Sequence, residues 1–124
     1  MDLTTIDWSR LEQLRALQKP GRPDVVRQLT ATYLANSRGL IASLDQALAD
    51  GNTDVMVRAA HSLKSTTATI GADALAQLAA QMETELRRGD TGTVVERLLP
   101  QFRLAHETVA NALTERYLPG ESPG

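Results

Sequence analysis

Apolar residues recur along most of the chain at spacings of three and four, the period that gathers them on one face of an α-helix. Glycine and proline interrupt this pattern at intervals and mark the ends of the helical segments. No stretch alternates apolar and polar residues as a half-buried strand does, so the pattern predicts no β-sheet. The predicted helical segments lie at about residues 7–18, 24–50, 53–70, 73–88 and 93–117.

The last four segments are long, amphipathic and joined by short connections. Such segments favour an all-α fold, an antiparallel up-down four-helix bundle over about residues 24–117. The short first segment is an additional N-terminal helix that we expect to cover one end or side of the bundle. A chain of 124 residues suffices for one domain and is too short for two, so 1–124 is interpreted as a single domain. Residues 118–124 are expected to form a flexible tail.

Local signals refine these boundaries. Asp7 is a plausible N-cap of the first segment, and Gly71 has the position of a C′ glycine after the third. The run from Thr93 to Glu96 fits a capping box at the start of the last segment. Pro100 lies inside that segment and removes one backbone hydrogen bond, so the sequence predicts a kink between Glu96 and Pro100.

Composition narrows the class of protein. Only 3% of the residues are aromatic, which predicts an aliphatic core, and 13 Lys and Arg against 15 Asp and Glu give a net charge of -2. This balance argues against nucleic-acid binding, which usually shows a basic excess. The absence of cysteine excludes disulfides, thiol nucleophiles and cysteine-based zinc sites. The sequence begins without a signal-peptide pattern and holds no apolar run of about 18 residues. We therefore expect a soluble, cytoplasmic domain without direct membrane contact.

The third segment carries a histidine on its polar face. At about 100° per residue, the apolar positions of this segment cluster around Leu63, and His61 lies about 160° away. Ser65 points in nearly the same direction as His61, and Lys64 lies on the flank one turn along. Ala68, one further turn on, is also small. The pattern predicts an exposed imidazole with an ammonium nearby and little side-chain bulk around it.

A neutral imidazole in such a setting can attack a phosphoryl group and hold it as a phosphoramidate. The ammonium would offset the charge of the transferred group, and small neighbours would let another protein approach. An exposed histidine on a helix is also often a solvated surface residue. Periodicity alone favours that second interpretation.

The residues around His61 favour the phosphoryl-accepting interpretation over that of a solvated surface residue. The run His61-Ser62-Leu63-Lys64-Ser65 is followed by a glycine ten residues after the histidine and by a leucine-rich segment that contains Leu75, Leu78, Met82 and Glu83. This pattern resembles the histidine phosphotransfer (HPt) domain. The resemblance is local to about residues 56–88, and the flanking segments agree with the four-helix bundle of that family. Ser65 departs from the pattern, because the family most often has glycine at this position.

The resemblance implies roles for single residues. His61 would be the phosphoacceptor and Lys64 its electrostatic partner, while the small Ser65 and Ala68 would leave room for docking. Glu83 falls where some family members place a polar residue that orients the imidazole. Arg87, one turn on, would help to recognise a phosphorylated partner. For both Glu83 and Arg87, a solvated helix face is an equally good interpretation.

The resemblance also implies partners. Family members carry phosphoryl groups between the aspartates of response-regulator receiver domains and have no ATP site of their own, which agrees with the missing P-loop and dinucleotide motifs. Mg²⁺ would belong to the receiver, so we predict no cofactor, no metal site and no autonomous enzyme. The chain would be either free-standing or the terminal domain of a hybrid sensor kinase.

Other candidates have simpler interpretations. His106 lacks the context of His61 and is expected to be partly buried with a structural role, and no second histidine follows it at metalloprotease spacing. Trp8 is expected to pack the first helix onto the bundle, and Tyr33 to lie in the core. The alternative function is a non-catalytic helical adaptor or dimerisation bundle in which His61 is incidental.

Overall fold

The computed structural model describes residues 2–120, and this range contains helices and turns but no strand. The all-α prediction is therefore confirmed. The helices are α1 (Trp8–Ala16), α2 (Val25–Asp50), α3 (Thr53–Thr69), α4 (Asp73–Arg87), α5 (Thr91–Thr93), the π-helix η1 (Val94–Leu98) and α6 (Leu99–Tyr117).

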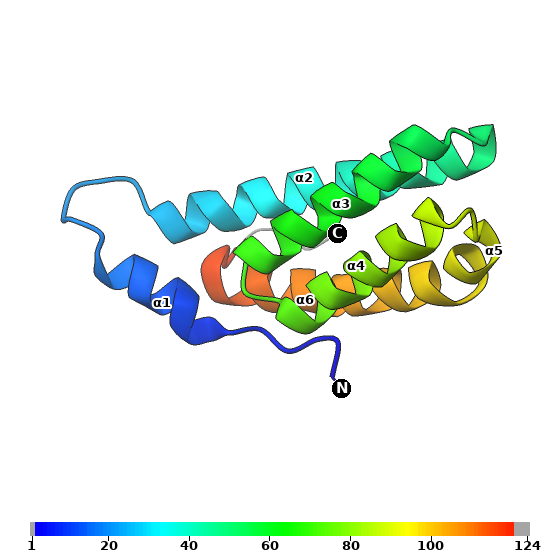
Figure 1. Cartoon of the computed structure of the whole chain (residues 1–124). Helices are drawn as coiled ribbons and strands as arrows, with labels where there is room; N and C mark the ends of the chain where they lie inside the picture. The colour runs from blue at the N-terminus through cyan, green and yellow to red at the C-terminus, as the bar shows by residue number, and fades with distance from the viewer. Residues whose placement is uncertain (1, 121–124) are drawn as a thin grey trace.

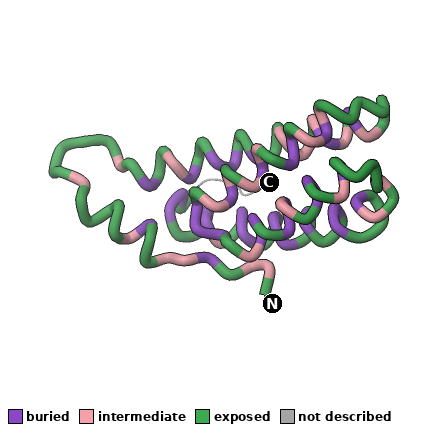
Figure 2. The backbone as a smooth tube through the Cα atoms, viewed as in Figure 1, coloured by how far each residue is buried: buried purple, intermediate pink, exposed green. Residues whose placement is uncertain are grey.

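The long helices α2, α3, α4 and α6 run alternately up and down and pack side by side (Figure 1). Buried positions face the inside of this bundle and exposed positions face outward (Figure 2). The core is aliphatic, as the composition predicts, with Phe102 as its one buried phenylalanine and Tyr33 only 3% exposed. Leu118, which the sequence assigned to a flexible tail, is buried in this core. Residues 121–124 of that predicted tail lie outside the described range.

The last predicted helical segment begins differently from the expectation. The capping box from Thr93 to Glu96 is wrong: the N-cap is Asp90, whose carboxylate accepts hydrogen bonds from the Thr93 backbone N–H at 3.0 Å and hydroxyl at 2.7 Å. Aspartate is a stronger N-cap than threonine, so the helix starts one turn earlier. Next to the kink predicted between Glu96 and Pro100, the structure has the π-helix η1, whose turns are wider than those of an α-helix. Pro100 supplies no N–H to the ladder there.

Helix α1 lies against the end of the bundle. The Arg10 guanidinium bonds the Asp73 carboxylate at 2.6 Å and the Ala68 carbonyl at 3.1 Å, which ties α1 to both sides of the α3–α4 turn. The Trp8 ring lies 6.0 Å from the Tyr117 ring at the end of α6. The prediction that Trp8 packs α1 onto the bundle is confirmed.

Gly71 forms the second attachment of α1. Its φ of +90° ends α3 in the left-handed region, as the C′ prediction requires, and its carbonyl accepts a 2.9 Å hydrogen bond from the Asp7 backbone N–H. Asp7 is the N-cap residue of α1, but its side chain accepts from the Ser9 hydroxyl and makes no backbone cap. A Cβ on Gly71 would lie 3.2 Å from the Asp7 carbonyl oxygen.

We predict that Gly71→Ala lowers the free energy of unfolding by more than the roughly 1–2 kcal/mol of left-handed strain alone, because the new methyl group also displaces Asp7. Gly51→Ala is the matched control, since Gly51 has a φ of +70° and a Cβ added there would meet nothing within 4 Å. Urea denaturation measures both variants. Equal losses would show that the close approach of Asp7 adds nothing to stability.

Candidate functional site

His61 lies near the middle of α3 and faces solvent. Its side chain is 55% exposed, whereas Leu63, two residues on, is fully buried. The face assignment made from the helical period is thus confirmed. Ser65 is exposed and Ala68 is half-buried on the same side of α3, and the Lys64 side chain is 37% exposed. Small side chains and one ammonium surround the imidazole.

A buried carboxylate from α4 meets this histidine. The oxygens of Glu83 lie 3.2 Å and 3.1 Å from Nδ1 of His61, and Oε1 also accepts a hydrogen bond from Lys64 Nζ at 3.2 Å. Oε2 accepts two hydrogen bonds from Arg87, at 2.8 Å from Nη2 and 3.2 Å from Nε. The Glu83 side chain is only 10% exposed. The interpretation of Glu83 as part of a solvated face is therefore wrong, because the packing of α4 against α3 places it at the inner edge of the site.

The surroundings of Glu83 fix its charge. Burial by itself raises the pKa of the carboxyl, but hydrogen bonds from Arg87, Lys64 and His61 outweigh it and lower the pKa to about 2. Hydrogen bonds and nearby cations favour the charged form in this way. Glu83 is a carboxylate at neutral pH.

The charge of Glu83 sets the proton position on His61. A carboxylate has no proton to donate, so the His61 Nδ1 that faces it must be the donor. In a neutral ring this leaves Nε2 as the nitrogen with the free electron pair. The exposed imidazole is thus held at Nδ1, and in the neutral ring Nε2 has the free electron pair.

The second histidine has a different environment. His106 is 3% exposed, and its Nε2 lies 2.8 Å from the Ser37 hydroxyl. Its ring stacks on Phe102 with the planes 15° apart, and the Tyr33 ring lies close by. Burial lowers the pKa of His106, and the nearby charge of Arg38 lowers it further. These contacts agree with the structural role expected for His106, which is buried more completely than predicted.

The described residues contain neither a cluster of metal ligands nor a helix that could span a membrane. No group of three or more His, Cys, Asp or Glu side chains that could hold a metal ion occurs in residues 2–120. Within the same range, none of the helices is long and apolar enough to span a membrane.

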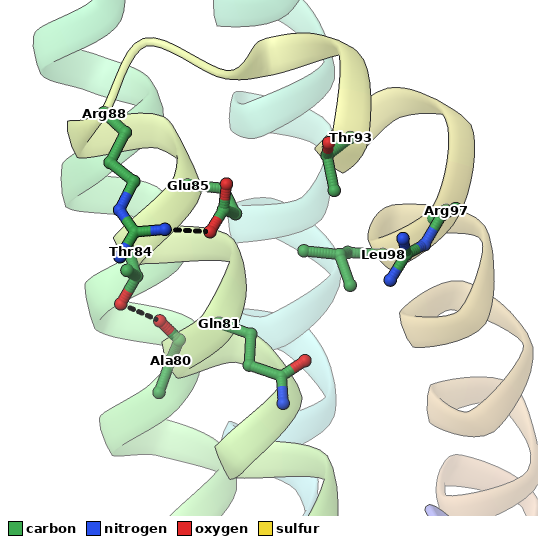
Figure 3. Close-up of a pocket in the computed structure, with 8 residues that line it drawn as sticks. All are labelled: Ala80, Gln81, Thr84, Glu85, Arg88, Thr93, Arg97 and Leu98. Carbon is green, nitrogen blue, oxygen red and sulfur yellow. Dashed lines mark hydrogen bonds and ion pairs between the residues drawn. The ribbon is translucent and has the colours of Figure 1, made fainter.

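A cleft between α4 and η1 is lined by Thr84, Arg88, Thr93 and Arg97 among others (Figure 3). Neither Glu83 nor any other residue hydrogen-bonded to His61 lines this cleft, so it is separate from the His61 site.

A family model described as the Hpt domain matches residues 28–112, which is more than half of the chain and includes the whole His61 site. The chain belongs to the Hpt domain family. No curated protein and no solved structure matches the chain. As an Hpt domain, it is a histidine phosphotransfer carrier of phosphorelay systems, a class that works without an ATP site of its own.

The ion pair between Arg87 and Glu83 in this Hpt domain was not predicted from the sequence. Arg87 forms an ion pair with Glu83 at 2.8 Å, although its side chain is largely exposed. The signal was present, because a glutamate four residues before an arginine on a helix forms a favourable ion pair. That spacing is common on exposed helices, and nothing in it reveals that Glu83 is buried against His61.

Proposed function

We propose that His61 accepts a phosphoryl group from the phosphorylated aspartate of one response-regulator receiver domain and passes it to the aspartate of another. The observation that carries this proposal is the hydrogen bond between Nδ1 of the exposed His61 and the buried Glu83 carboxylate, 3.1 Å at its shorter contact. It restrains the orientation of the ring, whose side chain is 55% exposed, and leaves Nε2 as the attacking atom. A surface histidine without a role would not need such an anchor.

The transfer step follows from this arrangement. The electron pair of Nε2 attacks phosphorus, the P–N bond forms, and the P–O bond to the receiver aspartate breaks, so that the aspartate leaves as a carboxylate. The proton on Nδ1 stays in place, and the positive charge that develops on the ring lies against the negative Glu83. The reverse reaction passes the phosphoryl group to a second receiver. Mg²⁺ would be supplied by the receiver and is not assigned to residues of this chain.

Lys64 supports the same proposal through its charge. Its ammonium is one turn from His61, near enough to interact with a phosphoryl group on Nε2. We predict that Lys64→Ala slows transfer or shortens the lifetime of phosphohistidine without abolishing acceptance, because Lys64 forms no bond to phosphorus. The effect should be modest, corresponding to about 0–1 kcal/mol, because solvent and salt weaken exposed charge pairs.

The measurement for Lys64 is the single-turnover transfer rate from one phosphorylated receiver at low and high salt. Lys64→Arg is expected to keep more activity than Lys64→Ala, although its wider planar head group takes more room beside a docked receiver. Unchanged rates and lifetimes in Lys64→Ala would remove Lys64 from the site.

The test of the proposed function is transfer from receiver domains encoded in the same genome. Each receiver is loaded with radiolabelled phosphate, freed of excess donor and mixed with the chain. We expect label on the chain that is labile in acid and stable in base, as a phosphoramidate is. The alternative, an adaptor or dimerisation bundle, predicts binding to a partner without any transfer of label.

A further inference from the structure

Arg87 has a different environment from the one expected of a residue that recognises a partner's phosphate. Although 62% of its side chain is exposed, both Nε and Nη2 point to one oxygen of Glu83. The other oxygen of Glu83 is bonded by Lys64, which comes from α3. The carboxylate therefore has two cationic partners, one from its own helix and one from the helix of His61.

Phosphorylation of His61 would affect the contacts of Lys64 and Arg87 differently. A phosphoryl group on Nε2 would add negative charge within reach of Lys64, whose flexible stem lets its ammonium move toward that charge. Glu83 would then lose one of its partners while still buried, and an unpaired buried carboxylate is costly. Arg87 is attached to α4 four residues from Glu83, so its contact does not depend on Lys64 or on the state of His61.

We infer that Arg87 is a positioning residue that anchors Glu83, so that the carboxylate keeps its hold on His61 Nδ1 while Lys64 turns to the phosphoryl group. This inference rests on the proposed function of His61. The two cations would therefore have different roles. Lys64 would interact with the transferred phosphoryl group, and Arg87 would hold Glu83, the residue that orients the His61 ring.

The electrostatics of the resting site agree with this division. Among the single contacts that lower the pKa of the Glu83 carboxyl, the hydrogen bonding from Arg87 has the largest effect, followed by the hydrogen bonds from Lys64 and His61. The two hydrogen bonds of Arg87 go to Oε2, whereas Lys64 bonds Oε1, and His61 Nδ1 lies between the two oxygens at 3.1 Å from Oε2 and 3.2 Å from Oε1. Arg87 thus restrains the oxygen that Lys64 does not contact.

The chain contains a matched control for an exposed arginine at this end of α4. Arg88 is the next residue, its side chain is 70% exposed, and it pairs with Glu85 at 3.1 Å (Figure 3). Arg88→Gln removes one arginine and one ion pair from the same helix end without touching Glu83. Arg87→Gln makes the same chemical change at the anchor.

The first measurement uses the unphosphorylated full chain and needs no receiver. Carbon-detected NMR follows the titration of the Glu83 carboxyl, and nitrogen NMR gives the tautomer of His61. In Arg87→Gln we expect the pKa of Glu83 to rise from about 2 toward its ordinary value of 4.5, with a smaller fraction of His61 protonated at Nδ1. Arg88→Gln should match the wild type in both. If Arg87→Gln also matches the wild type, Arg87 does not position Glu83 and the inference is overturned.

The second measurement is the transfer rate to His61 from a phosphorylated receiver. Arg87→Gln should be slower by roughly 10-fold, because a less restrained imidazole spends less time aligned for attack. A slower rate with unchanged Glu83 titration and His61 tautomer would instead assign Arg87 to receiver docking and contradict the inference. If no receiver phosphorylates the wild type, the proposed function fails, while a changed titration in Arg87→Gln still shows that Arg87 anchors Glu83.

Discussion

His61→Gln is expected to abolish phosphoryl acceptance and to leave the fold intact. The glutamine amide has no nucleophilic nitrogen, so no P–N bond can form at this position. The side chain of His61 is 55% exposed and lies outside the core, and such substitutions usually change stability by within about 0.5 kcal/mol. Label transfer from a phosphorylated receiver measures the first effect, and urea denaturation measures the second.

His106→Gln is the control for this variant, because it removes the other histidine. His106 is buried and bonded to Ser37, so its replacement should cost roughly 1–3 kcal/mol of stability, the range for disturbing a buried hydrogen bond. Phosphoryl acceptance by the folded variant should persist. Label on His61→Gln would identify another residue as the acceptor and contradict the assignment.

Glu83 variants are expected to show the second largest effect. Glu83→Ala removes both the hydrogen-bond acceptor for Nδ1 and the negative charge beside the ring, so we predict transfer slower by about 10- to 100-fold. Glu83→Gln keeps one oxygen that can accept from Nδ1 and loses the charge and the second acceptor oxygen. It should therefore lie between Glu83→Ala and the wild type. Equal rates in all three proteins would mean that the anchor has no part in transfer.

The same carboxylate predicts a pH dependence of stability. The pKa of Glu83 is about 2 in the folded chain and 4.5 as the ordinary value, so the unfolded state binds the proton more readily. The stability contributed by the carboxylate is therefore present above pH 4.5 and is lost as the pH falls toward about 2. Unfolding measured for wild type and Glu83→Gln should show a difference at about pH 6 that shrinks through this window. A difference that stays constant with pH would contradict the sign of the shift.

The helical period was sufficient to predict the long helices and the direction of their side chains. The period of about 3.6 residues predicted the long helices and placed His61 outward and Leu63 inward, because both consequences follow from helix geometry alone. Gly71 signalled the end of α3 through a conformation that favours glycine. These features need no knowledge of how helices pack on one another.

Features that depend on how the helices pack on one another could not be predicted from the sequence. Whether Glu83 is solvated or buried is decided by the register of α4 against α3, and that register also places the Glu83–Arg87 pair beside His61. The start of the last helical segment shows competition at short range, since Asp90 caps it in preference to Thr93. The π turn before Pro100 accommodates a missing N–H in a way that periodicity does not specify.

Nε2 of His61 is proposed as the phosphoacceptor because Glu83 holds Nδ1. The decisive experiment is phosphorus–nitrogen correlation NMR on chain labelled with ¹⁵N-histidine and phosphorylated by a receiver. We expect a single phosphorus resonance coupled to Nε2 of His61, with Nδ1 still protonated. Coupling to Nδ1 of His61, or to either nitrogen of His106, would show that the proposed acceptor atom is wrong.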